Sequence, residues 1–265
     1  MSKFTNKVIW ITGASSGIGE ALAYHFAAQN ARLVLSARRQ TELERVKKQC
    51  SAAADVLVLP LDLAQSNTFV DKVAEVVQKF GQIDYLINNG GISQRSLIKD
   101  TLADVDRQIM EVNYFGNILL TKAVLSQLVS QKQGHVTIIS SVAGKLAAPL
   151  RSTYSASKAA VISFFETVRA EYHHHNVEVL VVCPGYIQTN VSVNALTGDG
   201  SAQNTMDSTT GNGILPERCA ALIARAIRKR KQQVIISGAR EKLGIIVKKF
   251  FPRLFANMVR KAKVA

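Results

Sequence analysis

The sequence predicts an α/β protein with a doubly wound parallel sheet of about seven strands, helices on both faces and a single domain. Short apolar, β-branched runs alternate with longer helical patterns, which is the rhythm of repeated βαβ units. Most of the short runs are continuously apolar, as expected for strands that are covered on both faces. No linker rich in proline, glycine or serine divides the chain, and right-handed crossovers then give the doubly wound arrangement.

The predicted elements follow one another from the N-terminus without an internal repeat. The strand-like runs are Lys7–Thr12, Arg32–Ser36, Val56–Leu59, Ile83–Ile87, His135–Ile139, Val177–Cys183 and Gln233–Ser237. The helical patterns between them cover residues 17–29, 40–50, 66–80, 102–131, 153–175 and 216–230. Because a helix separates most consecutive strands, parallel pairing is expected throughout the sheet.

The composition is that of a globular protein. The chain has 265 residues, of which 47% are hydrophobic and 20% are charged, so it can bury a large core. Its three cysteines, Cys50, Cys183 and Cys219, are far apart, which argues against a disulfide framework or a zinc site and favours a reducing cytoplasm. We expect no signal peptide, because the N-terminus runs directly into a strand, and no apolar run reaches the ~18 residues of a membrane span.

The positive charge is concentrated near the C-terminus. The formal net charge is +14, and residues 225–265 hold 13 basic residues against one acidic residue. We therefore divide the chain into a body, residues 1–240, and a basic amphipathic tail, residues 241–265. The tail suits an anionic membrane surface, or it packs its apolar side over the substrate pocket or a partner subunit. Pro252 is expected to break or kink any helix there.

A glycine-rich turn follows the first strand and leads directly into a helix. Glycines at such a turn allow close approach of the backbone to phosphate, and the helix N-terminus offers unpaired N–H groups and the positive end of a dipole. The spacing G-x-x-x-G-x-G in this position predicts a dinucleotide site of the Rossmann type. The cofactor-binding residues predicted here are Gly13, Ser15, Ser16, Gly17, Ile18 and Gly19.

The end of the second strand indicates which dinucleotide is bound. NAD sites usually place an acidic residue there, whereas this chain has Arg38 and Arg39, and an arginine suits the 2′-phosphate of NADP. We therefore predict NADP(H) rather than NAD, with Arg38 as the first choice and Arg39 as the second. The alternative is a solvated arginine pair at a helix start. Asp62, which follows the third strand, is expected to contact the adenine or to cap the next helix.

A long segment, residues 190–212, is rich in Ser, Thr, Asn and Gly and has neither helical nor strand periodicity. It directly follows a strand, at the carboxyl edge of the sheet, where ligands bind in such folds. Loops of this length in a compact domain are usually functional or disordered. We interpret the segment as a mobile lid, the alternative being a disordered surface insertion.

A second group of polar residues lies where the later strands end. Tyr154 and Lys158 are four residues apart on a predicted helix and therefore share one face. A phenol has a pKa near 10, and a neighbouring ammonium lowers that pKa toward the range in which protons exchange at neutral pH. Ser141 follows the fifth strand, so its hydroxyl can orient a substrate oxygen. These residue types together suit proton transfer to a carbonyl oxygen.

In their order and spacing these motifs resemble the short-chain dehydrogenase/reductase family, in its shorter single-domain form. The resemblance covers about residues 7–190. The matching positions are T-G-x-x-x-G-I-G at 12–19, Asn88-Asn89-Gly90-Gly91, Asn113, Ser141, Tyr154-x-x-x-Lys158, Pro184-Gly185 and Thr189. Gly90 stands where the family usually has alanine. The glycine adds backbone freedom to this loop and removes the contact of a methyl group.

The resemblance implies an enzyme that moves hydride between NADP(H) and a carbonyl or secondary alcohol of a small molecule. Tyr154 would then be the proton donor and acceptor, and Ser141 would hold the substrate oxygen. Lys158 would hold the nicotinamide ribose, and Asn113 would hold a water that links Lys158 to solvent. Asn89 and Gly90 match the family's cofactor-binding loop.

The loop after the sixth strand is expected at the nicotinamide, with cofactor contacts from Pro184, Gly185, Ile187 and Thr189. Thr189 is expected to hydrogen-bond the carboxamide. Apolar residues nearby form a substrate wall or belong to the core, namely Val142, Leu146, Tyr186 and Val191. The run from Ser93 to Ser96 resembles a branch that includes membrane-associated retinoid and steroid reductases. Arg95 or Lys145 could anchor an acidic substrate, but both are expected to be exposed.

Other functions fit the sequence less well. His173, His174 and His175 point about 100° apart on a helix and are expected at a solvated helix end, so no metal site is predicted. Cys183 is expected in the core. A regulatory protein that only binds NADP would not need the tyrosine and lysine. Nucleic-acid binding by the tail is disfavoured because its basic residues lie beside an aliphatic stripe. The resemblance implies dimers or tetramers built on the helices 102–131 and 153–175.

Overall fold

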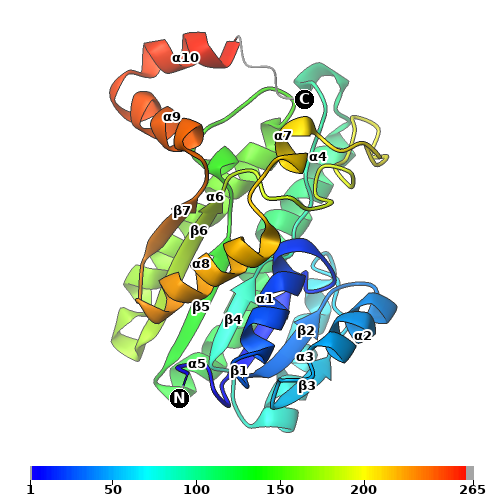
Figure 1. Ribbon diagram of the computed structural model, residues 1–265, viewed down its shortest axis with the longest axis vertical. Coiled ribbons are helices and arrows are strands. Elements are labelled where there is room, and N and C mark those ends of the chain that lie inside the picture. The colour runs from blue at the N-terminus through cyan, green and yellow to red at the C-terminus, as the bar shows by residue number, and fades with distance from the viewer. Residues whose placement is uncertain (1, 261–265) are drawn as a thin grey trace.

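Seven parallel strands form one sheet in the order β3-β2-β1-β4-β5-β6-β7, as the computed structural model in Figure 1 shows. The structure describes residues 2–260. The strands are β1 (Val8–Thr12), β2 (Arg32–Ser36), β3 (Asp55–Val58), β4 (Tyr85–Asn88), β5 (Gly134–Ile139), β6 (Val177–Pro184) and β7 (Gln233–Ile236). Every pairing is parallel, so the doubly wound α/β fold predicted from the sequence is confirmed.

The strand order reverses between β1 and β4. The chain steps outward from β1 to β2 and β3, then returns to place β4 on the other side of β1. Loops that leave the carboxyl ends of β1 and β4 therefore diverge to opposite sides and leave a crevice between them. In open α/β sheets, ligands bind at such a switch point.

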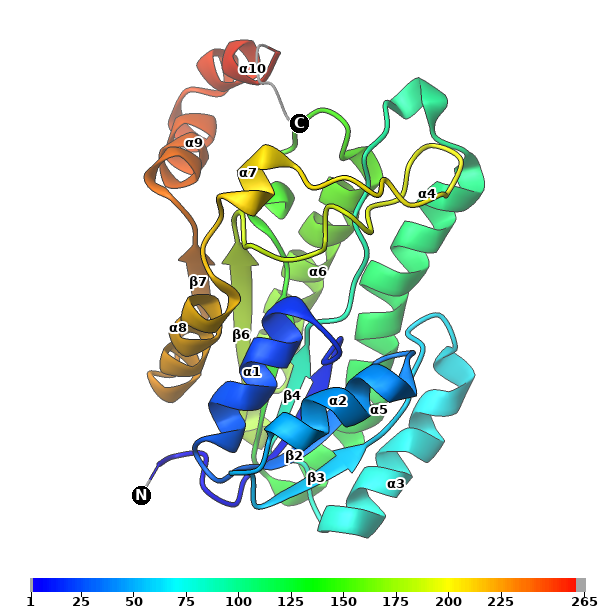
Figure 2. The ribbon, with the colours of Figure 1, turned by 45° about the vertical axis from the view of Figure 1, so that its right-hand side comes forward.

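Helices cover both faces of the sheet, as Figures 1 and 2 show. On one face the apolar residues of α1, α2 and α8 pack against the strands, and α1 lies against α8. On the other face α3, α5 and α6 do the same. The bounds of these helices are α1 (Gly17–Ala27), α2 (Gln40–Gln49), α3 (Phe69–Phe80), α5 (Gly116–Gln131), α6 (Ser152–Glu171) and α8 (Pro216–Arg228).

The central strand shows why the apolar runs are continuous. Ile9 and Ile11 belong to the core of one face, whereas Val8 and Trp10 belong to the core of the other. Successive side chains of a strand point to opposite faces, so a strand covered on both faces needs apolar residues at every position. The indole N–H of buried Trp10 donates to Ser36 Oγ at 2.9 Å, which satisfies the polar group of this side chain.

Two predicted helices differ from those observed. The predicted helix 102–131 is wrong as one continuous α-helix, because α4 (Ala103–Met110) and α5 are joined by a π-helical turn, η3 (Glu111–Phe115). The predicted helix 153–175 ends earlier, since α6 stops at Glu171 and a 3-10 turn, η5 (His173–His175), follows. The other predicted helices and strands agree within about three residues, the usual scatter of such boundaries.

The chain's last helices stand at the carboxyl end of the sheet, beside the segment 190–212 (Figure 2). They are α9 (Ala239–Phe250) and α10 (Pro252–Arg260), and Pro252 opens α10 and so separates the two, as predicted. The segment 190–212 is folded back on itself by a bridge between Leu196 and Ala202, and a second bridge joins Leu196 to Gln94. The segment ends in the short helix α7 (Ser208–Gly211). Within residues 2–260, no helix is both long and apolar enough to cross a membrane.

Candidate active site

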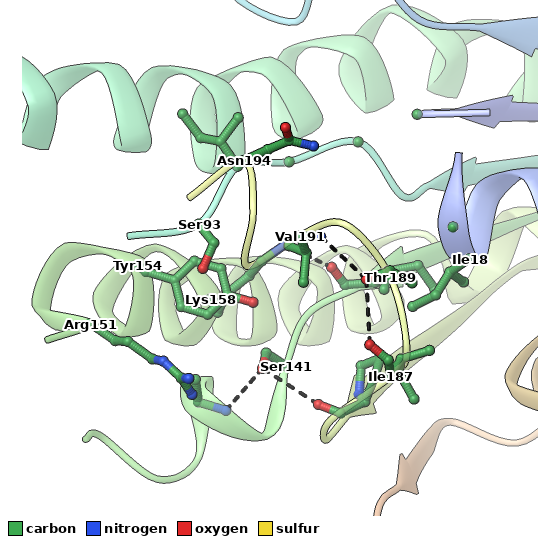
Figure 3. A pocket seen from close by; sticks show the side chains of 18 of the residues that line it. Ile18, Ser93, Ser141, Arg151, Tyr154, Lys158, Ile187, Thr189, Val191 and Asn194 are labelled. Atoms are coloured by element: carbon green, nitrogen blue, oxygen red, sulfur yellow. Dashed lines mark hydrogen bonds between the residues drawn. The ribbon is translucent and has the colours of Figure 1, made fainter. Parts of the chain in front are cut away.

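A cavity of about 930 Å³ opens at the carboxyl ends of the strands. Its walls come from the loops that follow β1 to β6, from the start of α6 and from the C-terminal helix α10. Figure 3 shows its reacting end, where Ser141, Tyr154 and Lys158 lie together and Arg151 reaches toward them from one side. The cavity thus lies at the switch point of the sheet and brings together most residues predicted from the sequence.

The glycine turn after β1 forms one end of the cavity. Gly13 has a φ of +63°, which side-chain-bearing residues rarely adopt. At Gly19 a Cβ would lie 2.2 Å from the carbonyl oxygen of Gly13, so the helix can start this close to the strand only with glycine. The residues of this turn that line the cavity are Gly13, Ser15, Ser16, Gly17 and Ile18, and Gly19 lies behind them.

The turn is held in place from β4. The side-chain amide of Asn89 donates to the carbonyl oxygens of Thr12 and Gly13 at 3.0 and 3.2 Å. The Thr12 hydroxyl oxygen accepts the backbone N–H groups of Asn89 and Gly90, each at 3.0 Å. Ser16, the N-cap of α1, makes no side-chain cap hydrogen bond, so the helix N-terminus is open toward the cavity. Such a terminus fits the pyrophosphate of a dinucleotide.

The space beside Gly90, where the family usually has an alanine methyl group, is occupied by the side chain of Leu63. A Cβ at this position would lie 2.6 Å from Leu63 Cδ1, and Gly90 itself is buried. The leucine side chain therefore fills the space that an alanine methyl group would take. The loop is packed at Gly90, so the expected loss of a contact there is compensated by Leu63.

The end of the cavity beside β2 carries two exposed guanidinium groups. Arg38 and Arg39 follow β2 and line the cavity together with Asp62. Asp62 Oδ1 accepts the backbone N–H of Ala64 at 3.0 Å, so this carboxylate is fixed within its own turn. No acidic side chain directly follows β2, since residues 37–39 are alanine and two arginines. This donor set fits a dinucleotide that carries an additional phosphate on the ribose.

The reacting end is built on α6. Tyr154 and Lys158 both line the cavity, and the ammonium nitrogen of Lys158 lies 5.9 Å from the centre of the Tyr154 ring. Lys158 is buried and donates to the carbonyl oxygen of Ile139 at 3.0 Å. Burial lowers the pKa of this lysine to about 8. Lys158 is therefore mostly protonated at pH 7 and loses its proton within about one pH unit above that.

Ser141 lies across the cavity from α6, at the end of β5. Its hydroxyl oxygen accepts the N–H of Ala143 at 3.0 Å and the hydroxyl donates to the carbonyl oxygen of Pro184 at 3.4 Å. The donation to Pro184 is long, so the hydroxyl can turn toward a substrate oxygen at little cost. The serine is held by its own short turn, which fixes its position relative to Tyr154.

Asn113 occupies the centre of the π-helical turn and is completely buried. Its amide exchanges two hydrogen bonds with the backbone of Ile92, at 2.8 and 2.9 Å, and donates to Ser157 Oγ at 3.1 Å. It does not line the cavity itself. A Cβ built on Gly91 would lie 2.9 Å from Asn113 Oδ1 and 3.3 Å from Lys158 Nζ, so both groups border the same small space. That space is where a relay water would have to bind.

The loop after β6 forms another wall of the cavity. Its predicted cofactor residues all line the cavity, namely Pro184, Gly185, Ile187 and Thr189. Thr189 also contacts the glycine turn, because a Cβ on Gly17 would lie 2.9 Å from its methyl group. The predicted apolar wall is also found at the cavity, formed by Val142, Leu146, Tyr186 and Val191.

The basic tail contributes to this wall from the outside. Phe255 and Val259 of α10 line the cavity, and Lys248 of α9 donates to the carbonyl oxygen of Lys145 at 2.6 Å. The tail therefore packs over the pocket, one of the two arrangements left open by the sequence. Its outer face exposes large apolar side chains, namely Leu243, Ile246, Phe250, Phe251, Leu254 and Met258.

Gln94 is a site residue that the sequence did not reveal. Its side chain is fully buried, and its carbonyl oxygen accepts the backbone N–H groups of Thr153 and Tyr154 at 3.0 and 3.2 Å. It therefore caps the start of α6 and fixes the backbone of Tyr154. The partners are about 60 residues apart in sequence, so no local pattern could have indicated this contact.

Arg95 was expected on the surface, and this is wrong. Its side chain is only 6% exposed and pairs with Asp207, on the segment 190–212, which is 3% exposed. Arg151, the residue before α6, also contacts Asp207, at 3.3 Å. Desolvation raises the pKa of Asp207, but its hydrogen bonds and the two arginines outweigh this, so the pKa is lowered overall. Arg95 lies 112 residues from Asp207, so the pair was not visible in the sequence.

Two expectations about uninvolved residues are confirmed. Cys183 is buried in the core of one sheet face, and burial raises its pKa to about 11. The three histidines of η5 are all exposed. Over the described residues, no group of three or more His, Cys, Asp or Glu side chains could hold a metal ion.

Comparison with known proteins assigns the family. The model of the short chain dehydrogenase family matches residues 7–199. Over 99% of its length, the chain is 44% identical to a dehydrogenase/reductase SDR family protein 7-like of Drosophila melanogaster, 83% of which is covered. It is 42% identical over 96% of its length to dehydrogenase/reductase SDR family member 7B of Mus musculus, 80% of which is covered.

Solved structures show the same fold. A short chain dehydrogenase/reductase from Burkholderia phymatum, solved in complex with NAD, superposes with a TM-score of 0.84 at 22% identity and covers 96% of each chain. Levodione reductase superposes with a TM-score of 0.81 at 24% identity, over 91% of this chain and 99% of that one. The chain belongs to the short-chain dehydrogenase/reductase family and is an oxidoreductase that acts on CH–OH or C=O groups.

Proposed function

We propose that this protein is an NADP(H)-dependent oxidoreductase for a carbonyl or secondary alcohol on a largely apolar small molecule, with Tyr154 as its proton donor and acceptor. The observation that carries the proposal is that Tyr154, Lys158 and Ser141 line the same cavity as the glycine turn. One continuous space can therefore hold a dinucleotide and present its reacting ring to these three side chains.

The cofactor site uses main-chain groups at one end and side chains at the other. The turn from Gly13 to Gly19 receives the pyrophosphate at the N-terminus of α1. Asn89 and Gly90 hold this turn against β4. Lys158 holds the nicotinamide ribose, and the loop from Pro184 to Thr189 encloses the nicotinamide. When bound, the nicotinamide supplies or accepts the hydride.

The protein's own residues carry the proton. In reduction the Tyr154 hydroxyl gives its proton to the carbonyl oxygen, and in alcohol oxidation the phenolate takes it back. The Lys158 ammonium lies 5.9 Å from the ring centre, so its positive charge attracts the negative charge that develops on Tyr154 during proton transfer. The Ser141 hydroxyl donates to the substrate oxygen and so fixes its position beside Tyr154. Asn113 holds the relay water next to Lys158.

The preference for NADP over NAD is supported by the end of β2. Arg38 and Arg39 line the cavity there, and no carboxylate follows β2 directly to bind the ribose hydroxyls of NAD. An arginine fork matches the geometry of a phosphate, so Arg38 is the main ligand of the 2′-phosphate and Arg39 supports it.

The substrate's apolar character is supported by the cavity wall. Val142, Leu146, Tyr186 and Val191 line it, and Phe255 and Val259 of the tail complete it. The experiment that tests the reaction is the turnover of NADPH, with NADH in parallel, against ketones and aldehydes that include retinoids and steroids. We expect NADPH turnover that is lost in Tyr154→Phe. Tight cofactor binding without turnover of any compound would instead favour a regulatory protein.

We further propose a homo-oligomer, a cytoplasmic location and contact of the tail with membrane surfaces. The segment 190–212 acts as a lid over the substrate. The membrane proposal is supported by Phe250, Phe251 and Leu254, which are at least half exposed beside the basic residues of α9 and α10. The subunit interface of the oligomer would be built on the helices within residues 102–131 and 153–175. A monomer in light scattering would refute the proposed oligomer.

A further inference from the structure

The two arginines that meet Asp207 are not equally neutralised. Arg95 donates from Nε and Nη2 to Asp207 Oδ2, and from Nη1 to Ser93 Oγ and to the carbonyl oxygen of Gln94. Each nitrogen of the Arg95 guanidinium thus has an acceptor. The other oxygen of Asp207 accepts from Gln203, so one carboxylate faces two guanidinium groups, and the closer contact is the one with Arg95.

Arg151 is left as the surplus cation. Its side chain is 9% exposed, and its contacts are long: 3.3 Å from Nη2 to Asp207 and 3.5 Å from Nη1 to the Tyr186 hydroxyl. Its Nε is buried and has no hydrogen-bond partner. A buried charge without a matching partner is costly, and natural proteins normally pair it. The site therefore lacks one negative charge.

The position of Arg151 at the start of α6 also favours the binding of an anion beside it. It is the residue immediately before α6, a 20-residue helix, where the helix dipole favours an anion and disfavours a cation. It lines the cavity, as Tyr154 does, and precedes Tyr154 by three residues, so the two backbone positions lie about one helical turn apart. In Figure 3 the Arg151 side chain extends from one side toward Tyr154 and Ser141.

The other charges at this end of the cavity do not neutralise Arg151. The cations that line it are Arg95, Arg151 and Lys158, and Glu241 of α9 is the carboxylate on the rim. Among residues 2–260, Glu241 forms no ion pair with any of them. Arg95 and Arg151 thus share the single negative charge of Asp207, and a substrate that enters the cavity beside Arg151 can bring the second one.

We propose that the substrate carries an anionic group, a carboxylate or a phosphate, close to its reacting carbonyl, and that Arg151 binds this group. The inference rests on the proposed function, because it assumes that the substrate occupies the space beside Tyr154. The anion docks between the Arg151 guanidinium and the start of α6, while the apolar wall receives the rest of the molecule. Such a substrate is amphipathic: charged near the carbonyl and apolar beyond it.

The test measures binding rather than turnover. The full chain is saturated with NADP⁺, which occupies the phosphate sites of the cofactor, and calorimetry at pH 7 compares matched probes. Benzoate is compared with benzamide, and phenylphosphonate is compared with benzenesulfonamide. We expect at least one anion to bind about 10- to 100-fold more tightly than its neutral counterpart, as charge-assisted hydrogen bonds to a buried arginine imply. The better of the two anions identifies carboxylate or phosphate as the recognised group.

Three variants assign the effect. Arg151→Met should reduce the ratio of anionic to neutral affinity to below about threefold, and Arg151→Lys should retain part of it because the charge remains without the fork. Arg107→Met is the matched control, since it removes one positive charge at a side chain that is 77% exposed and outside the cavity, and it should keep the full ratio. Binding of NADP⁺ shows that each variant is folded.

Equal affinity for anionic and neutral probes in the natural chain would overturn the proposal. So would a ratio that survives in Arg151→Met, or the failure of both anions to bind at 10 mM. The proposed function fails differently, by the absence of Tyr154-dependent NADPH turnover on any carbonyl compound. Turnover of neutral ketones without anion binding would therefore leave the reaction standing and refute only the role of Arg151.

Discussion

Replacing Gln94 with leucine removes the cap of α6 without leaving a large cavity, because the two side chains have similar shapes. Gln94 accepts the N–H groups of Thr153 and Tyr154, and its amide nitrogen donates to the hydroxyls of Ser96, Thr101 and Ser152. Loss of a helix cap costs about 1 kcal/mol, and leaving a buried donor unpaired costs about 1–3 kcal/mol. We expect Gln94→Leu to lower the free energy of unfolding by about 2–3 kcal/mol.

The assay is thermal unfolding followed by circular dichroism. For a chain of this size, each kcal/mol shifts the midpoint by about 2–4 °C, so Gln94→Leu should unfold about 5–10 °C below the natural protein. Because the unpaired N–H groups include that of Tyr154 itself, kcat should fall as well, even at temperatures where the variant is fully folded.

The control is Gln40→Leu, the same exchange at an exposed position at the start of α2. It should stay within about 0.5 kcal/mol of the natural protein, as substitutions at exposed sites usually do. A midpoint for Gln94→Leu within 2 °C of the natural protein would refute the inference that Gln94 anchors α6. An unchanged kcat would show that the cap does not position Tyr154.

Four further predictions follow from the site and the tail. Arg38→Ser should raise the KM for NADPH about tenfold and leave the KM for NADH within twofold, because in the proposed complex the exposed guanidinium would contact only the extra phosphate. Asp207→Asn should lower the free energy of unfolding by about 3 kcal/mol, measured by urea denaturation, since it leaves two buried arginines without a counter-charge. The pKa of Lys158 is lowered by burial to about 8 from 10.5, so the folded chain releases this proton first. Stability should therefore rise from pH 8 to 10.5, while kcat/KM for carbonyl reduction falls above pH 8 as the ammonium is lost. Finally, the chain should sediment with anionic vesicles at low salt, and Phe250→Glu combined with Leu254→Glu should abolish this.

The sheet could be predicted because its cause is local. A strand covered on both faces requires a run of apolar residues, as in Val8–Thr12, and the helices between the runs force parallel pairing. The glycine turn was equally visible, since Gly13 and Gly19 satisfy steric demands that no other residue meets. Tyr154 and Lys158 could be placed together because four residues of helix put two side chains on one face.

The remaining features depend on contacts between distant segments. Gln94 caps a helix that begins about 60 residues later, and Arg95 pairs with Asp207 across 112 residues, so neither role has a local pattern. In the π-helical turn at Glu111–Phe115, each backbone hydrogen bond spans one residue more than in an α-helix. No proline or glycine within the turn marks this change in the sequence. The amphipathic pattern of the tail predicted that it has an apolar side. Only the fold shows that Phe255 lines the cavity whereas Phe250 is exposed to solvent.

The central claim is that hydride passes to a carbonyl carbon while Tyr154 supplies the proton. The most direct measurement uses NADPH deuterated at the transferring position, with mass spectrometry of the alcohol product from the natural chain and from Tyr154→Phe. We predict one deuterium on the carbinol carbon and a rate that falls about 10²- to 10⁴-fold in the variant, the usual contribution of a general acid. A product without deuterium would contradict hydride transfer, and an unchanged rate in Tyr154→Phe would contradict the role of Tyr154.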